Sequence, residues 1–337
     1  MRPYRFTPVN IATVWGTEEW ILSAMEGRQT VCGCELSALV EKYGARLVGE
    51  KVWNRFGNRF PLLIKHINAR QQLSVQVHPN DAMAKGKDLP NGKTEMWYVI
   101  QAARDSELLV GFRKRFTASE FNRIVANSIS EEDVQKGEKT LENVLNRFRP
   151  QKGDWYYIPA GTVHSIGAGV KLLEIQQPSD TTYRLYDFNR LDKDGKKRRL
   201  DVKDALMAID FEETLEKEVE VQRNVFAPLG SPATPTGNVR TEPMVSCEYF
   251  TTKFLDFTAL GNSAHPVLYN HDYSDTGSFS VIVCTGGSGK LFFCPVAGSC
   301  IKEMLPIKDG DLYLLPAELK CVQLQSVSDL QIVEIHI

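Results

Sequence analysis

An eight-residue pattern occurs twice in this chain, and it constrains the fold more than any other feature. Gly153–Ala160 (GDWYYIPA) recurs 157 residues later as Gly310–Ala317 (GDLYLLPA). Each copy has a glycine–aspartate turn, then an aromatic and aliphatic run that ends at a proline, which is typical of a β-strand. The repeat predicts two β-sandwich units in one chain.

Short β-branched and aromatic runs, broken by Gly, Pro, Asn and Asp, dominate the rest of the chain. Many short strands separated by turn residues are typical of a sandwich or a jelly roll. We therefore expect a mainly β protein, with strands that include residues 93–100, 154–159, 170–176, 278–284 and 311–316.

Helices are expected as insertions between these strands. Thr117–Glu120 forms a capping-box pattern ahead of a largely polar stretch that reaches about Arg149. Asp201 is placed to cap a helix over 202–209, and residues 35–48 also have a helical pattern. A stretch around 227–243 is rich in Pro, Gly, Thr and Ser, which predicts a linker.

Composition excludes several classes of function. The chain has 337 residues, 42% of them hydrophobic, and a formal net charge of −2. A nearly neutral protein lacks the basic surface of a general nucleic-acid binder. Neither a signal peptide nor a membrane-spanning segment is predicted. Seven cysteines without a compact framework are expected to be free thiols in a reducing cytoplasm.

Four residues on strand-like segments form a candidate metal site. Side chains alternate along a strand, so Gln76 and His78 project to the same face. Two further strands can bring Glu95 and His164 into the same cavity. This mixed nitrogen and oxygen set suits zinc with one position left open. His78 or His164 alone is better explained as an ordinary loop or strand-end histidine, and the four together favour a ligand set.

The repeat gives the second unit a different chemistry. At the offset of 157 residues, His164 falls on Cys321, so the second copy keeps the turn and strand but lacks the imidazole. We therefore expect a structural duplicate that binds no metal. His271 and His336 lie in this unit without ligand-like spacing.

Several motifs in a fixed order resemble type I phosphomannose isomerase, a cupin-fold enzyme family, and the length resembles its short bacterial members. The similarity runs from about Trp15 to about Phe211 and is weaker beyond. The motifs are 60–65 (FPLLIK), 76–81 (QVHPND), 92–98 (GKTEMWY), 158–164 (IPAGTVH) and 174–187 (EIQQPSDTTYRLYD).

The resemblance implies a fold and a domain division. It indicates a double-stranded β-helix, the cupin jelly roll, present in two units with helical insertions. Residues 1–235 are expected to form the catalytic domain, and residues 236–337 a degenerate cupin-like β domain. The oligomeric state is not indicated by the sequence.

The resemblance also assigns roles to residues. Gln76, His78, Glu95 and His164 match the zinc ligands, with one Zn²⁺ per chain. Arg184 matches a catalytic residue, and Lys93 matches an active-site lysine. The implied reaction interconverts mannose 6-phosphate and fructose 6-phosphate. Zinc suits this isomerisation because it is a Lewis acid without redox chemistry.

The base that moves the proton between C1 and C2 is left open by the sequence. Neither Arg184 nor a zinc-bound glutamate is an obvious base, which leaves a metal-bound water or a nearby carboxylate such as Glu174. Lys93 and Arg184 are suited to bind phosphate or enediolate oxygens. Surface salt bridges are the alternative for both.

One departure from the family pattern favours a second hypothesis. After Trp20 this chain has Ile21, where many members carry glutamate. A sugar-phosphate-binding cupin without turnover is therefore an alternative. An iron-dependent cupin oxygenase is a third, because Gln76 and Glu95 are harder ligands than an all-histidine set.

Overall fold

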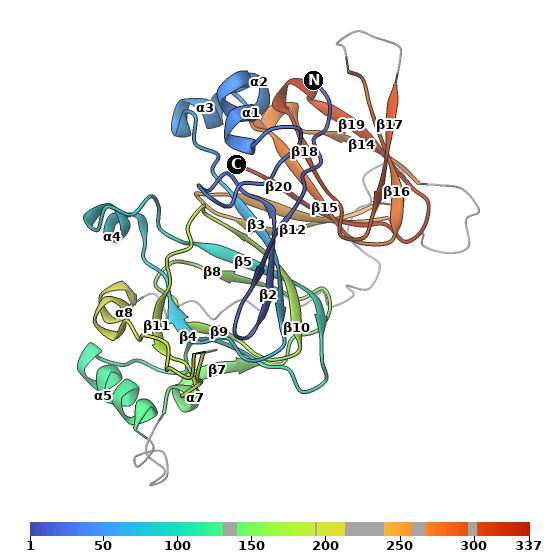
Figure 1. Cartoon of the computed structure of the whole chain (residues 1–337). Helices are drawn as coiled ribbons and strands as arrows, with labels where there is room; N and C mark the ends of the chain where they lie inside the picture. Colours follow the sequence, from blue (N-terminus) through green and yellow to red (C-terminus); the bar gives the residue numbers. More distant parts are fainter. Residues whose placement is uncertain (131–139, 193, 213–238, 258–266, 296–301) are drawn as a thin grey trace. The chain divides into compact units, whose positions relative to one another are not determined.

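Two compact units make up the chain, and neither is continuous in sequence. The computed structural model describes residues 1–130, 140–192, 194–212, 239–257, 267–295 and 302–337 (Figure 1). The central unit comprises Asn10–Trp20 and Leu62–Val225, and the terminal unit comprises Met1–Val9, Ile21–Pro61 and Phe226–Ile337. The expected domain boundary between residues 235 and 236 lies outside the described residues, so the division 1–235 and 236–337 stays a prediction.

Two sheets form the framework of the central unit. The first has the order β1-β2-β3-β10-β5-β8 and the second has the order β11-β4-β9-β6-β7. The strands of the first are β1 (Val9–Ala12), β2 (Gly16–Leu22), β3 (Leu63–Ala69), β10 (Val170–Gln176), β5 (Glu95–Ala102) and β8 (Trp155–Ile158). Those of the second are β11 (Tyr183–Tyr186), β4 (Val75–Val77), β9 (His164–Ile166), β6 (Leu108–Phe112) and β7 (Leu145–Phe148).

Apolar clusters hold this unit together. One cluster unites side chains from both sheets, among them Trp97 of the first sheet and Val110 and Ile166 of the second. A second cluster packs helices against the strands β4, β6 and β11, which places the helices α5 and α8 outside the second sheet (Figure 1). The helices of this unit are α4 (Asp81–Gly86), α5 (Ala118–Ile129), α7 (Leu141–Val144) and α8 (Val202–Ala208).

The helix expected after Thr117 is confirmed at its start and differs at its end. The Thr117 hydroxyl accepts a hydrogen bond from the backbone of Glu120, and the Glu120 carboxylate accepts one from the backbone of Thr117. This helix, α5, ends at Ile129 instead of near Arg149. Residues 145–148 form β7 because pairing with β6 overrides the helical pattern there.

Asp201 precedes α8 as expected, but its side chain does not cap the helix. The Asp201 carboxylate accepts a hydrogen bond of 3.3 Å from the backbone N–H of Arg184 instead. The interaction ties the start of α8 to β11.

Two further sheets form the framework of the terminal unit. Their orders are β12-β13-β20-β15-β18 and β14-β19-β16-β17. The first contains β12 (Arg240–Ser246), β13 (Thr251–Asp256), β20 (Gln331–His336), β15 (Ser280–Gly286) and β18 (Leu312–Leu315). The second contains β14 (Leu268–Asp272), β19 (Cys321–Ser326), β16 (Ser288–Phe293) and β17 (Glu303–Lys308). One apolar cluster with Phe257, Leu291 and Leu324 fills the space between them.

Short helices complete the terminal unit. They are α1 (Leu36–Tyr43), α2 (Ala45–Val48), α3 (Glu50–Phe56), and the 3₁₀ turns η2 (Ser274–Thr276) and η3 (Ala317–Leu319). The helix expected over 35–48 is therefore two helices. Gly44 separates them with a φ of 51°, a left-handed conformation that glycine adopts without the steric cost of a Cβ.

The expected linker over 227–243 is only partly described. Residues 227–238 lie outside the described residues. The remainder enters β12, which includes Pro243 and so corrects the prediction. β12 is an edge strand, and an edge strand tolerates a proline because one side of it needs no ladder hydrogen bond.

The repeated octapeptide has the same structure in both units. Gly153 and Gly310 have φ angles of 92° and 84°. Asp154 accepts a hydrogen bond from the backbone N–H of Gln151 at 2.8 Å, and Asp311 accepts the equivalent bond from Lys308 at 3.0 Å. Beyond the repeat, however, Cys321 is exposed, and the buried residue of β19 at this level is Val322. The simple offset therefore paired His164 with the wrong neighbour.

Candidate metal centre and active site

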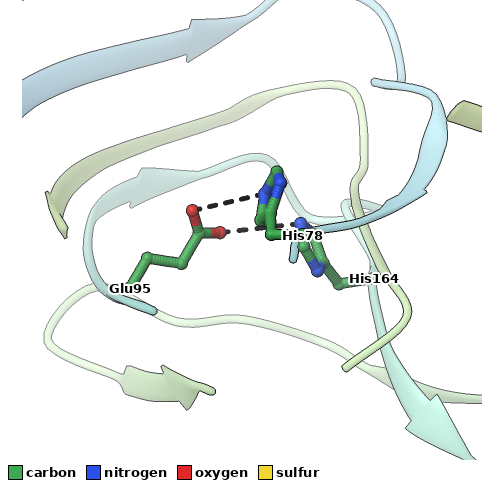
Figure 2. A group of neighbouring side chains, drawn as sticks. All are labelled: His78, Glu95 and His164. Carbon is green, nitrogen blue, oxygen red and sulfur yellow. Dashed lines mark ion pairs between the residues drawn. The ribbon is translucent and has the colours of Figure 1, made fainter. Parts of the chain in front are cut away.

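Three side chains that can ligate a metal converge in the central unit. They are His78 just after β4, Glu95 at the start of β5 and His164 at the start of β9 (Figure 2). One ligand atom from each lies within 4.8 Å of the others, and all three side chains are buried. The Glu95 oxygens lie 3.5 Å from Nε2 of His78 and 3.6 Å from Nε2 of His164.

Strand register brings Gln76 and Arg184 to the same face. Gln76 lies directly opposite His164 in the β4–β9 pair, and Arg184 lies directly opposite Gln76 in the β11–β4 pair. Residues directly opposite in an antiparallel pair share a face. Arg184, Gln76 and His164 therefore form one row across three strands. The Gln76 amide lies 3.3 Å from Nε2 of His164.

Backbone carbonyls fix the orientation of both imidazoles. Nδ1 of His78 lies 2.9 Å from the carbonyl oxygen of Thr181, and Nδ1 of His164 lies 2.9 Å from that of Thr162. A carbonyl only accepts, so each Nδ1 carries the proton and each Nε2 is an acceptor. Nε2 of His78 accepts from Lys93, and Nε2 of His164 accepts from the amide nitrogen of Gln76. This arrangement is typical of metal-binding histidines.

Burial keeps both histidines neutral. Burial and the Lys93 charge hold the pKa of His78 well below its ordinary value. Burial likewise lowers the pKa of His164 to about 4. Neutral imidazoles are the form that binds a metal, so neither histidine needs to lose a proton at neutral pH.

Glu95 experiences opposing influences. Burial raises the pKa of Glu95 to about 7, and the neighbouring Lys93 acts to lower it. Lys93 Nζ lies 2.9 Å from a Glu95 oxygen and 3.1 Å from Nε2 of His78. The indole N–H of Trp97 donates to the other Glu95 oxygen at 3.0 Å. These contacts favour the carboxylate form that a metal ligand needs.

A buried ion network lies beside the ligands. Glu174 on β10 forms an ion pair with Lys65 on β3, with 3.1 Å between the Glu174 oxygen and Lys65 Nζ. The two residues are directly opposite in register. Lys65 also contacts Glu18 on β2 at 3.4 Å. Burial acts to raise the pKa of Glu174, but Lys65 and Lys93 hold it below its ordinary value. Glu174 is thus ionised at neutral pH.

Arg184 is partly buried without a strong carboxylate partner. Its nearest carboxylate is that of Asp201 at 4.0 Å, and its Nε has no hydrogen-bond partner. Burial and the charge of Arg198 lower the pKa of Arg184. A guanidinium in these surroundings is suited to bind an anion.

Comparisons with known proteins agree on one family. The model of the type I phosphomannose isomerase catalytic domain matches residues 12–114. The chain is 31% identical to mannose-6-phosphate isomerase ManA of Bacillus subtilis, over 93% of both proteins. It is 30% identical to mannose-6-phosphate isomerase of Streptococcus mutans, over 83% of this chain and 77% of that one. The chain belongs to the type I phosphomannose isomerase family.

Solved structures show the same fold. The crystal structure of mannose 6-phosphate isomerase from Bacillus subtilis matches 100% of both chains, with a TM-score of 0.76 and 24% identity. A variant of phosphomannose isomerase from Salmonella typhimurium matches with a TM-score of 0.72 and 16% identity, over 99% of each chain. These are the structures of aldose–ketose isomerases of a metal-dependent family.

The donor set of the chain fits the metal dependence of type I phosphomannose isomerases. Two neutral imidazoles with unprotonated Nε2 atoms face one carboxylate, and an amide side chain lies next to them. This set of nitrogen and oxygen donors suits a divalent transition metal.

The structure brings together most of the residues that the sequence indicated. Gln76, His78, Glu95 and His164 gather as expected, and Lys93 contacts two of them. The sequence reasoning missed Glu18 and treated Lys65 only in passing. Lys65 follows Ile64 and lies two residues before Ile67, and this apolar context gave no indication of its buried ion pairs. Only the strand register reveals them.

The unusual Ile21 is an apolar core residue, 4% exposed. A carboxylate is nevertheless supplied nearby by Glu18, two residues before Trp20 on the same strand. The Trp20 indole N–H donates to Glu18 at 2.8 Å, and Lys65 Nζ lies 5.0 Å from the centroid of the Trp20 ring. The substitution at Ile21 therefore leaves an acidic group beside Lys65.

Proposed function

We propose that the protein interconverts mannose 6-phosphate and fructose 6-phosphate, with one Zn²⁺ held by Gln76, His78, Glu95 and His164. The observation that carries the proposal is the convergence of His78, Glu95 and His164, with both Nδ1 atoms anchored to carbonyls. Membership of the family supports the sugar-phosphate substrate.

We further propose that each unit is a cupin jelly roll and that the central unit is the catalytic one. The order β2-β3-β10-β5-β8 corresponds to β12-β13-β20-β15-β18, and β4-β9-β6-β7 corresponds to β14-β19-β16-β17. The octapeptide turn supports the correspondence, because it precedes β8 in one sheet and β18 in the other.

A cytoplasmic location is part of the proposal. The six described cysteines are free thiols, as expected in a reducing compartment. Among the described residues, no helix is both long and apolar enough to cross a bilayer.

When bound, zinc supplies a Lewis acid that polarises the sugar carbonyl. Arg184 then binds the anionic parts of the substrate. It lies in the row with Gln76 and His164, and its guanidinium can donate two parallel hydrogen bonds to phosphate or enediolate oxygens. Lys93 adds a second positive charge beside the ligands, and its contact with Glu95 favours the ionised form of that ligand.

Glu174 is the carboxylate we assign to proton transfer. The reaction removes a proton from C2 of the aldose and returns it to C1 of the enediolate, while the hydroxyl proton passes from O2 to O1, which gives the ketose. Lys65 and Lys93 keep Glu174 ionised, so it is ready to accept a proton. Its low pKa makes it a weaker base than a carboxylate tuned to the operating pH, but lets it return the proton readily to the adjacent carbon.

The test combines metal analysis with an isomerase assay on the purified full-length chain. We expect about one zinc per chain, turnover of mannose 6-phosphate that a chelator abolishes, and recovery on adding zinc. The variant His164→Ala should lose more than about 100-fold in metal affinity, since loss of a supporting group alone costs about 10–100-fold. Turnover that survives complete metal removal would contradict the metal role, and binding without isomerisation would support the non-catalytic alternative.

A further inference from the structure

The terminal unit contains a buried polar centre that strand register relates to the metal centre. Ser280 lies opposite Leu315, as Glu95 lies opposite Ile158. Leu315 and Ile158 are equivalent positions of the repeated octapeptide. Ser280 therefore occupies the position of Glu95.

Backbone hydrogen bonds support this equivalence. The N–H of Val99 donates to the carbonyl of Asp154 at 2.8 Å, and the N–H of Cys284 donates to that of Asp311 at 2.9 Å. Val99 lies four residues after Glu95, and Cys284 lies four residues after Ser280. β5 and β15 therefore correspond residue by residue.

The lysine–glutamate pair recurs at the equivalent positions, with the lysine side chain 31% exposed in Lys253 and 5% exposed in Lys65. Glu174 lies opposite Lys65 and Trp97, and Glu334 lies opposite Lys253 and Ile282. Lys253 Nζ lies 2.9 Å from Glu334, close to the 3.1 Å of the Lys65–Glu174 pair. The central unit and the terminal unit thus hold the same ion pair on the same two strands.

The ligand positions have changed instead. His271 lies opposite Val322 in the β14–β19 pair, as Gln76 lies opposite His164 in the β4–β9 pair. Nε2 of His271 lies 3.2 Å from the Ser280 hydroxyl, so the His271–Val322 pair is the one that faces the Glu95 position. Two residues after His271, Tyr273 takes the place of His78 and donates to the carbonyl of Pro316.

Unsatisfied atoms mark the centre as polar. His271 is 0% exposed and Glu334 is 1% exposed. Nδ1 of His271 lacks a hydrogen-bond partner, and Nε2 of His271 lies 3.5 Å from a Glu334 oxygen. Burying such groups without partners costs free energy, so apolar residues are expected at these positions unless the ion pair fixes them.

We infer that the terminal unit holds a latent divalent-metal site, in which His271 is a retained ligand position and Tyr273, Ser280 and Val322 are lost ones. Removing a ligand from a buried site needs one substitution, whereas removing one member of a buried ion pair leaves an uncompensated charge. The ligands were therefore free to change while Lys253 and Glu334 stayed together. The inference rests on the metal centre proposed for the central unit.

The test restores two of the three lost ligands in the full-length chain with Ser280→Glu and Val322→His, which with His271 gives two imidazoles and one carboxylate. We expect the double variant to bind two metal ions per chain where the unsubstituted protein binds one. Cobalt(II) provides a second measurement, because a second site adds its own visible absorption band. The matched control, Ser280→Gln with Val322→His, has nearly the same volume but no carboxylate, and should bind the second ion at least about tenfold more weakly.

The outcomes separate the two proposals. A native chain without metal contradicts the proposed function. A native chain with one metal, whose folded double variant still binds one, overturns the latent site. If the double variant does not fold, Ser280→Asp with Val322→His, which is one methylene shorter, is judged by the same rule. Failure of both variants to fold also overturns the inference, because the unit then does not accommodate the ligand set.

Discussion

The Glu95 carboxylate shows how much a single residue depends on its surroundings. Burial raises its pKa to about 7 even though Lys93 at 2.9 Å opposes that rise. A charged ligand and a neighbouring cation thus stabilise each other in the interior of the central unit. Lys93 lies two residues before Glu95, the first residue of β5, and its ammonium contacts the Glu95 carboxylate.

Arg184 provides the sharpest test at the scale of a residue. We expect Arg184→Ala to keep its metal and to lose about 10²–10³-fold in kcat/KM, the usual cost of removing one group that stabilises transition-state charge. Arg184→Lys is the matched control. Lysine keeps the positive charge but lacks the planar guanidinium, so the activity of this variant should fall between that of Arg184→Ala and that of the unsubstituted protein.

Metal content and steady-state kinetics measure these effects. An Arg184→Ala variant with unchanged turnover would remove Arg184 from the reaction. A variant that also lost its metal would instead assign it a structural role beside Gln76, its neighbour in register.

The four metal-ligand candidates were predictable from sequence because each lies in or next to a strand within a short motif. The ion pairs were not. Lys65, Glu18 and Glu174 lie on three different strands, and their contacts follow from a register that no local pattern encodes. The sequence comparison matched His164 with Cys321 for the same reason. The buried residue at this level of β19 is the next one, Val322.

At the scale of an element, α5 depends on its first turn. Its inner face buries Phe121, Ile124 and Val125 against the second sheet. The capping box satisfies two backbone N–H groups that the helix itself leaves unpaired. The sequence predicted this start because the box is local, whereas the end of α5 depends on pairing elsewhere.

We expect Thr117→Ala to lower the free energy of unfolding by about 1 kcal/mol. Thr117→Ser keeps the hydroxyl and should lie within about 0.5 kcal/mol of the unsubstituted protein, as for an ordinary surface substitution. Chemical denaturation measures both. Equal losses in the two variants would indicate that the methyl group of Thr117, and not its hydroxyl, matters.

At the scale of the molecule, acid stability should depend on the buried centre of the terminal unit. Burial lowers the pKa of His271, and Glu334 opposes that effect. The groups that face His271 are Lys253, Glu334, His336 and Asp272. An unfolded histidine binds its proton near pH 6.5, but folded His271 does so only at lower pH. Its contribution to stability is therefore complete above pH 6.5 and decreases as the pH falls.

We expect the free energy of unfolding to drop below pH 6.5 by up to about 1.4 kcal/mol per pH unit for this proton. His271→Asn does not titrate and should show a smaller slope between pH 6.5 and pH 5. Denaturant unfolding at several pH values measures the slope. Identical slopes would show that His271 does not bind a proton differentially.

The mainly β class and several strands were predictable, because alternation and turn residues are local. The grouping of Met1–Val9 and Ile21–Pro61 with the C-terminal strands was not, since it depends on contacts between residues separated by hundreds of positions.

That discontinuity has a consequence for synthesis on the ribosome. The central unit is complete once residue 225 has left the exit tunnel, so its sheets can form while translation continues. The segments 1–9 and 21–61 emerge first, yet their packing partners are made last. These early segments remain without their packing partners for most of the elongation time, and a chaperone can bind them during that interval.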